Sequence, residues 1–110
     1  MAKKELVETA AKEEIVTGPA KMRCFLEDEV REFDIEVMKV DQETAEINKG
    51  MMIRVTDEEL LEKTGGIIQG MSGSPILQNG KLIGAVTHVF VMDSTKGYGI
   101  FAETMLEQLK

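Results

Sequence analysis

Cysteine and histidine are scarce in this chain of 110 residues, which carries one of each, Cys24 and His88. A single cysteine cannot form an intrachain disulfide or a Cys-rich metal site. A histidine-based zinc site would need carboxylates for every other ligand, so we predict no metal site and no cofactor. Uninterrupted apolar runs are only a few residues long, so we expect neither a transmembrane helix nor a secretory signal.

Positive charge is also in short supply. The chain has 13 basic and 20 acidic side chains, which gives a formal net charge of -7. Nucleic acids and anionic membranes attract proteins through a cationic surface. We therefore expect neither class of partner. The apolar content of 43% is ordinary for one globular domain of this length.

Apolar and polar residues alternate from Ile15 onward, as they do in half-buried β-strands. The apolar members of the alternation are Met22, Cys24 and Leu26, then Phe33, Ile35 and Val37, and then Met51, Ile53 and Val55. After Val37 the phase shifts to Met38 and Val40, which predicts a β-bulge at this point. Cys24 is in phase with its neighbours and is interpreted as a small buried apolar residue.

Turn signals complete an all-β prediction. Asn79-Gly80 between two apolar runs is a strong signal for a β-hairpin. A last strand is expected over 98–102 and a terminal helix over 103–109. About six short strands separated by turns are typical of an antiparallel barrel or sandwich. Residues 1–14, rich in Ala, Lys and Glu, are expected to be a loosely held linker or a segment foreign to the domain, which then spans 15–110.

One segment, residues 65–75, indicates chemistry. It places two serines, Ser72 and Ser74, among four glycines ahead of the hairpin. Glycines allow successive N–H groups to point into one concavity. A hydroxyl at the edge of that concavity can attack a carbonyl while the N–H groups of Gly70 and Ser72 hold the oxyanion. Glycine and serine are also typical of plain loops, so the residues alone leave both interpretations open.

A family resemblance favours the chemical interpretation. The run Gly70-Met71-Ser72-Gly73-Ser74-Pro75, the Asn-Gly hairpin and the Gly97-Tyr98-Gly99 strand resemble the C-terminal barrel of trypsin-like serine peptidases. Residues 65–101 are more closely similar to the SpoIVB peptidase family of endospore-forming bacteria, and a weaker similarity extends over most of residues 15–106. The resemblance implies a trypsin-like antiparallel Greek-key barrel, the C-terminal one of two, with a C-terminal helix. It also implies a serine endopeptidase that acts through an acyl-enzyme.

The resemblance also assigns roles by position in the motif. Ser72 matches the nucleophile, Asp57 the carboxylate that orients a histidine, and the amides of Gly70 and Ser72 the oxyanion hole. The residues that match the flanks of the primary specificity pocket are Thr87, His88, Val89, Gly97, Tyr98 and Gly99. Asp57 has a second interpretation, because Thr56 is the expected N-cap of a helix that ends at Gly65-Gly66, and a carboxylate suits a helix N-terminus.

The sequence departs from the family at the catalytic histidine. In the family this histidine precedes the aspartate, within the first barrel, whereas no histidine precedes Asp57 here. The family's membrane anchor and PDZ domain also have no counterpart in the sequence. His88 is expected to line the pocket rather than to act as the base, so the 110 residues alone are predicted to be inactive or nearly so. The expected partners are a peptide or protein substrate and the N-terminal barrel of the parent peptidase.

The resemblance implies a place in sporulation signalling, where the family cleaves a regulatory component of a membrane complex outside the cytoplasm. A first alternative is a non-catalytic module that binds an extended peptide by strand addition, or associates with itself through an uncovered apolar side. A second alternative is a structural fragment without activity of its own. Hydrolysis that depends on Ser72 would separate the enzyme from both.

Overall fold

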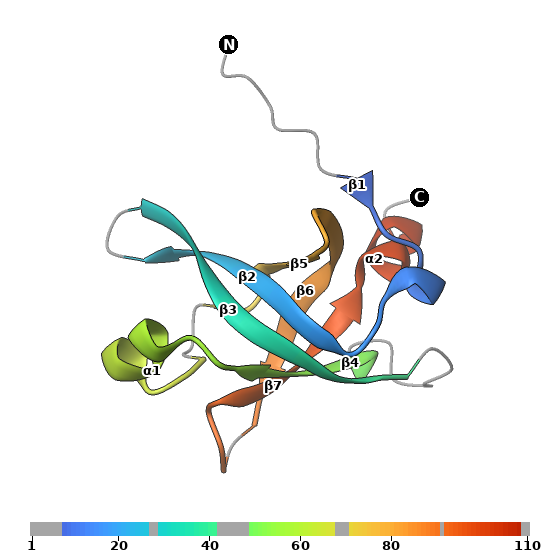
Figure 1. The fold of residues 1–110 in the computed structure, drawn as a ribbon. Helices are drawn as coiled ribbons and strands as arrows, with labels where there is room; N and C mark the ends of the chain where they lie inside the picture. The colour runs from blue at the N-terminus through green and yellow to red at the C-terminus, as the bar shows by residue number, and fades with distance from the viewer. Residues whose placement is uncertain (1–7, 27–28, 42–48, 68–70, 91, 109–110) are drawn as a thin grey trace.

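The strands of this protein close into an antiparallel barrel. The computed structural model describes residues 8–26, 29–41, 49–67, 71–90 and 92–108. The barrel strands are β2 (Gly18–Leu26), β3 (Glu29–Val40), β4 (Met51–Val55), β5 (Pro75–Gln78), β6 (Lys81–Val89) and β7 (Lys96–Phe101). They follow the order β2-β3-β4-β7-β6-β5, and pairing of β5 with β2 closes the barrel (Figure 1). The predicted all-β barrel with a C-terminal helix, α2 (Ala102–Gln108), is confirmed.

Alternation along the strands fills the barrel interior. Apart from the two residues predicted after the bulge, the predicted inward residues whose side chains are described are all buried: Met22, Cys24, Phe33, Ile35, Val37, Met51, Ile53 and Val55. The predicted bulge is confirmed by a register shift between Val37 and Lys39 opposite β4. The inward phase expected after it is wrong for Met38, which is 37% exposed, because the bulge leaves this residue out of the pairing.

The close approach of β6 and β7 to β4 depends on glycines. A Cβ added to Gly84 would lie 2.1 Å from the main-chain oxygen of Ile100 and 2.3 Å from Met51 Cε. A Cβ added to Gly99 would lie 3.1 Å from Ile76 Cδ1. Buried side chains of β4 and β5 therefore occupy the space that these two glycines leave.

The hairpin between β5 and β6 turns at Asn79 and Gly80, as predicted. Their φ angles of 54° and 79° are both in the left-handed region that a type I′ turn requires. Gln78, just before the turn, is buried, and its Nε2 donates to the main-chain oxygens of Val16 at 2.8 Å and Pro19 at 3.2 Å. One side chain thus joins the hairpin to the chain that enters β2.

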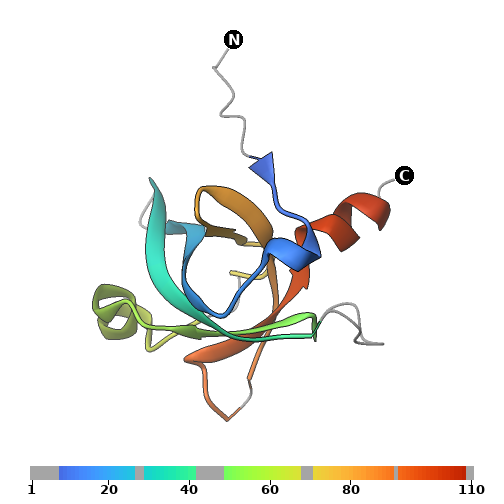
Figure 2. The same cartoon turned by 45° about the vertical axis from the view of Figure 1, so that its right-hand side comes forward.

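The segment before β2 lies against the barrel. Its short strand β1 (Glu8–Thr9) pairs with β6 in parallel, and a 3-10 turn, η1 (Lys12–Glu14), follows. Ala10 is 2% exposed, and the Lys12 N–H donates to Glu103 Oε1 of α2 at 2.8 Å. Figure 2 shows η1 beside α2. Residues 8–14 therefore lie against the barrel, while residues 1–7 of the expected linker lie outside the described residues. The domain boundary at residue 15 stays a prediction.

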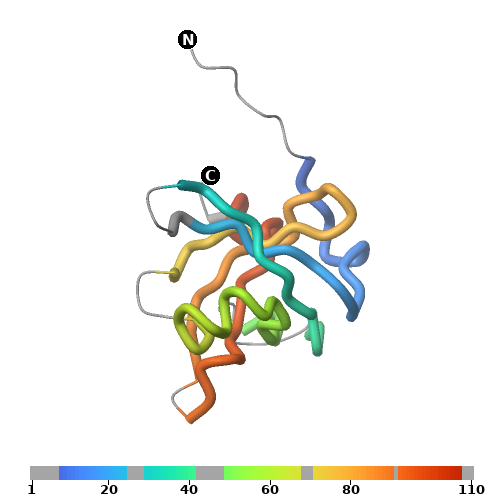
Figure 3. Tube along the Cα trace, turned by 60° about the vertical axis from the view of Figure 1, so that its left-hand side comes forward, coloured from blue at the N-terminus to red at the C-terminus, as the bar shows by residue number. Residues whose placement is uncertain are grey.

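Helix α1 (Glu58–Thr64) leads toward the glycine-rich segment. It ends at Gly65, whose φ is 76° and whose N–H donates to Leu61 O at 2.9 Å, as the Gly65-Gly66 pair predicts. Ser94 Oγ donates to Gly65 O at 3.0 Å, and the Ile67 N–H donates to Ser94 O at 2.7 Å. The end of α1 therefore lies beside the connection of β6 to β7 (Figure 3). Within the described ranges neither helix reaches the length or apolarity needed to cross a bilayer.

Replacing Gly84 with Ala is expected to lower the free energy of unfolding by about 2–3 kcal/mol, because main-chain atoms of β7 must move to admit the methyl group. Gly80→Ala is the comparison, since nothing lies within 4 Å of a Cβ there and only the φ of 79° opposes it. Its cost should be about 1 kcal/mol. Urea unfolding of both variants measures the difference, and equal costs would contradict this packing.

Candidate functional site

Ser72 lies at the exposed apex of a tight turn. The Ser74 N–H donates to Met71 O at 3.0 Å, and Gly73 has a φ of 90°. These are the features of a type II turn, in which glycine takes the third position and Ser72 the second. The side chains on either side, those of Met71 and Ser74, are buried, whereas Ser72 is exposed. The turn is thus anchored in the core and presents its hydroxyl-bearing residue to solvent.

Two main-chain hydrogen bonds fasten this turn to β6. The Gly73 N–H donates to Val86 O at 2.7 Å, and the Val86 N–H donates to Ser74 O at 3.0 Å. Pro75 then begins β5, which pairs with the same strand. Ser72 is therefore positioned by the barrel wall, even though it sits in a turn.

The Ser72 N–H is one of the two amides predicted for the oxyanion hole. Among the residues that the structure describes, this N–H has no acceptor. Because Ser72 is exposed, this N–H remains a candidate donor to a ligand. The second amide, that of Gly70, lies outside the described residues.

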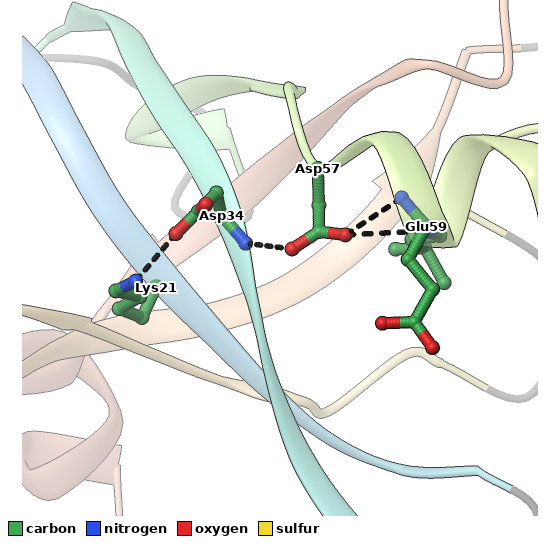
Figure 4. A network of polar contacts seen from close by, with 5 residues as sticks. Lys21, Asp34, Asp57 and Glu59 are labelled. Atoms are coloured by element: carbon green, nitrogen blue, oxygen red, sulfur yellow. Dashed lines mark hydrogen bonds and ion pairs between the residues drawn. The ribbon is translucent and has the colours of Figure 1, made fainter.

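Asp57, and not Thr56, is the N-cap of α1. Its Oδ1 accepts from the N–H groups of Glu59 at 3.0 Å and Leu60 at 3.2 Å (Figure 4). The prediction of Thr56 as the cap is wrong because the Thr56 N–H donates to Asp34 O at 3.1 Å and so extends the pairing of β4 with β3. The helix therefore begins at Glu58, one residue later than predicted, with Asp57 as its cap. Asp57 does lie at the N-terminus of the helix, as its second interpretation expects, but as the cap itself, and its role toward a histidine stays a prediction.

The other oxygen of Asp57 is held by β3. Its Oδ2 accepts from the Asp34 N–H at 3.1 Å. The side chain of Asp34 pairs with Lys21, which lies directly opposite on β2 (Figure 4). This ion pair is exposed and adds little stability, whereas the main-chain pairing of β3 with β2 positions the Asp34 N–H that donates to Asp57.

The donors around Asp57 favour its charged form. Partial burial raises the pKa of the carboxyl, but the N–H groups of Asp34, Leu60 and Glu59 outweigh burial, and the positive charge of Arg31 acts in the same direction. The pKa of Asp57 consequently lies below the ordinary aspartate value. Asp57 is therefore ionised at neutral pH, as an acceptor for an imidazole N–H must be.

The residues predicted to flank the specificity pocket are divided between two faces of β6 and β7. His88 and Tyr98 are directly opposite each other, and both line a cleft of about 350 Å³ together with Val89. Gly97 and Gly99 alternate with Tyr98 and so face the other side. A Cβ there would lie 3.0 Å from Ile67 Cδ1 and 3.1 Å from Ile76 Cδ1, respectively.

Thr87 belongs to neither group. It lies at a register shift between Val86 and His88, and its Oγ1 donates to Tyr98 O at 3.2 Å. The structure thus gathers His88, Val89 and Tyr98 and leaves Gly97 and Gly99 against buried side chains. The assignment of all six to one primary pocket stays a prediction.

Beyond Val86, β6 offers an open edge. The Phe90 N–H donates to Lys96 O at 3.0 Å, so the main-chain groups of Phe90 point toward β7. Because successive residues of an antiparallel strand point to opposite sides, the N–H and C=O of Val89 point away from β7. Pairing of β6 with β5 reaches only as far as Ala85. In the described part of the chain, the edge next to the Ser72 turn is therefore unoccupied at Val89.

His88, the single histidine, is exposed and lines the cleft. No hydrogen bond joins it to Ser72 among the described residues. Across the same ranges, no three His, Cys, Asp or Glu side chains come together in a way that could hold a metal ion.

Sequence reasoning missed Lys49, Phe90 and Met92, which complete the lining of the cleft. The available signal was the apolar run 89–92 at the end of a hairpin, where polar residues are usual.

Asp57→Ala is expected to cost about 1–2 kcal/mol of unfolding free energy at pH 7, because three main-chain donors lose their acceptor. Asp57→Asn keeps an acceptor oxygen and should cost less. The folded-state pKa is lowered, so the charge-dependent part is present above about pH 4, the ordinary aspartate value, and is lost as pH falls through the folded pKa.

Urea unfolding of the wild type and both variants between neutral and acid pH measures this dependence. Glu58→Gln, which removes the neighbouring exposed carboxylate of the first turn, is the control. The account fails if Asp57→Ala is no less stable than this control, or if the gap between wild type and Asp57→Asn widens in acid.

Comparison with known proteins agrees with the geometry. The chain matches the family model for SpoIVB peptidase S55 over residues 1–106, a span that contains Asp57, the Ser72 turn and every barrel strand. A search of curated proteins and a search of solved structures gave no match. The resemblance predicted from the motif is thereby confirmed. The chain belongs to the SpoIVB peptidase S55 family.

Proposed function

We propose that this domain contributes the nucleophile of a serine endopeptidase, and that Ser72 attacks the carbonyl of a peptide bond. The observation that carries the proposal is the turn itself, which exposes Ser72 between the buried side chains of Met71 and Ser74 and is fastened to β6 by the hydrogen bonds of Gly73 and Ser74 to Val86. A nucleophile held in this way can approach a carbonyl without a change in the backbone. Membership of a peptidase family supports the reaction class.

The negative charge that develops on the carbonyl oxygen would be held by the Ser72 N–H, a candidate donor, and by the amide of Gly70. One donor of this kind typically lowers the barrier by about 3–4 kcal/mol. The turn therefore supplies both the attacking oxygen and a stabilising dipole beside it.

Asp57 would orient the imidazole that takes the proton of Ser72. The carboxylate is ionised, and N–H groups from β3 and α1 fix its position. A carboxylate accepts about four hydrogen bonds, two on each oxygen, so Oδ2, which accepts only from the Asp34 N–H, retains a lone pair. The same contacts that cap the helix would thus pre-organise an acceptor for a histidine Nδ1–H.

The imidazole itself would come from outside these 110 residues. His88 lines the cleft and makes no hydrogen bond to Ser72 among the described contacts. Without a base beside it, a serine hydroxyl is a weak nucleophile. We therefore propose that the chain alone hydrolyses peptides slowly or not at all, and that the N-terminal barrel of a parent peptidase completes the site.

A peptide substrate would bind as an extra strand on the open edge of β6. The N–H and C=O of Val89 offer one donor and one acceptor, and they lie on the strand that holds the Ser72 turn. Strand addition of this kind recognises the main chain of the substrate. The SpoIVB family comes from sporulating bacteria, and we place the substrate among regulatory components of a membrane complex that the family cleaves outside the cytoplasm in sporulation signalling.

A second candidate is a peptide-binding module without catalysis. The open edge at Val89 favours it, because strand addition there needs no reaction at Ser72. The two candidates differ in whether Ser72 forms an acyl-enzyme.

Free imidazole is expected to restore reactivity to the isolated chain. Acylation of the protein by p-nitrophenyl acetate should be near background alone and should rise about tenfold or more with added imidazole, since general-base catalysis contributes that much or more. Intact-mass spectrometry measures the acylation of the protein, since imidazole also releases nitrophenolate from the ester without protein.

Ser72→Ala should abolish the imidazole-dependent acylation. Ser74→Ala is the matched control, since it removes the buried hydroxyl of the same turn and should leave the rate unchanged. Imidazole-dependent labelling that survives Ser72→Ala, or that never rises above background, would favour the binding module.

A further inference from the structure

The turn between β6 and β7 is hydrogen-bonded to two other segments through consecutive main-chain oxygens. The Ile67 N–H donates to Ser94 O at 2.7 Å, and the Val55 N–H donates to Thr95 O at 2.7 Å. We call residues 93–96 the bridging turn. It binds the end of β4 through one carbonyl group and the chain that follows α1 through the preceding one.

The bridging turn is fixed by hydrogen bonds of its own. The Lys96 N–H donates to Asp93 O at 3.1 Å, which closes the turn. Asp93 Oδ1 accepts from the Thr95 N–H at 3.0 Å and from Thr95 Oγ1 at 2.5 Å. Side-chain oxygens of aspartate and threonine stabilise turns in this way. The carbonyl groups of Ser94 and Thr95 are therefore held in a defined direction.

Gly66 allows the bridging turn to approach the end of α1. A Cβ added to Gly66, whose φ is 134°, would lie 2.3 Å from Ser94 O and 3.0 Å from the Thr95 nitrogen. Gly65 has a φ of 76°, but nothing lies within 4 Å of a Cβ added there. Gly65 ends the helix and accepts from Ser94 Oγ at 3.0 Å, whereas Gly66 supplies the space for Ser94.

The bridging turn holds both ends of residues 55–67, the segment that contains α1. Asp57 lies two residues after the start of this segment, and Ser72 lies five residues after its end. Beyond Ser72, the chain is fastened to Val86 by the bonds of the Ser72 turn. The described chain is thus fixed on both sides of Ser72, and the fixed point on the N-terminal side is shared with the strand that leads to Asp57.

We propose that Ser94 and Gly66 are positioning residues, which set the place of the Ser72 turn relative to Asp57 through the bridging turn. This inference rests on the proposed function, in which Asp57 and Ser72 act on the same imidazole. Displacement of a reacting group by about 1 Å can cost about a hundredfold in rate. Contacts that fix the chain before Ser72 therefore affect acyl transfer, although they touch neither the substrate nor the imidazole.

The Ser94 hydroxyl is tested with two variants, because Ser94→Ala removes the donor to Gly65 O and Ser94→Thr retains it. Imidazole-dependent acylation of Ser72 by p-nitrophenyl acetate should fall about threefold or more in Ser94→Ala. Ser94→Thr should restore it to within about twofold of the wild-type rate. Intact-mass spectrometry gives the rates, under conditions in which urea unfolding shows each variant to be folded.

Gly66→Ala tests the close approach, with Gly65→Ala as the matched control. Both substitutions strain a positive φ, but only the methyl group at residue 66 displaces Ser94. Gly66→Ala should lower the acylation rate of the folded protein about tenfold or more, and Gly65→Ala should lower it less than about threefold. Equal losses in the two variants would contradict a role of the contact with Ser94.

Amide signals of the ¹⁵N-labelled protein report the position of Ser72 without any reaction. Ser94→Ala should shift the signals of Ile67 and Ser72, and Ser94→Thr should leave the Ser72 signal near its wild-type place. An unshifted Ser72 signal in Ser94→Ala, acylation of this variant at the wild-type rate, or a rate that stays low in Ser94→Thr would overturn the inference.

Failure of the proposed function gives a different result. The wild-type protein would then show no imidazole-dependent acylation that requires Ser72. The amide signals of Ser72 in the two Ser94 variants would still decide whether the bridging turn positions this residue.

Discussion

The pair of main-chain hydrogen bonds between Val86 and the turn at residues 73–74 is the constraint on which the candidate site depends. Without it, the segment between α1 and β5 would be a glycine-rich loop with no fixed relation to the barrel. With it, the type II turn has a fixed position, in which Met71 and Ser74 are buried and Ser72 and Gly73 between them are exposed. The strand that holds the turn also carries the open edge at Val89. The proposed nucleophile and the edge proposed to bind a substrate are thus both positioned by β6.

Asp57 connects the fold to the site in a second way. The same carboxylate ends the pairing of β4 with β3 and begins α1, so a change made to alter catalysis there also alters stability. Kinetic effects of substitutions at Asp57 therefore need a stability measurement beside them. In contrast, Ser72 makes no contact on which the fold depends among the described residues, and its substitution should report on chemistry alone.

Much of the barrel could be predicted because its signals are local. The period-2 alternation around Phe33 and Ile53 specifies which face is buried, and Asn79-Gly80 specifies a turn that few other residue pairs allow. The cap at Asp57 was missed because the Thr56 N–H pairs with the main-chain oxygen of Asp34. Asp34 lies on the neighbouring strand β3 but is more than twenty residues away in the sequence, so local sequence signals do not reveal this bond. Alternation along β7 predicts that Tyr98 points to one side of the sheet and that Gly97 and Gly99 point to the other. The resemblance to a motif did not use this, because it assigns roles by position in the sequence and not by the side to which a residue points. In the cleft lined by His88 and Tyr98, Lys49 lies beside β6 and β7, and no spacing in the sequence predicts this proximity.

The central claim is that the Ser72 turn presents an alcohol oxygen and its own N–H to one reacting group. A crystal structure of the chain after reaction with a diphenyl phosphonate in the presence of imidazole tests this most directly. The account predicts phosphorus bonded to Ser72 Oγ, with a phosphonyl oxygen about 2.7–3.1 Å from the Ser72 nitrogen. Phosphorus on another side chain, or a phosphonyl oxygen turned away from that N–H toward solvent, would contradict it.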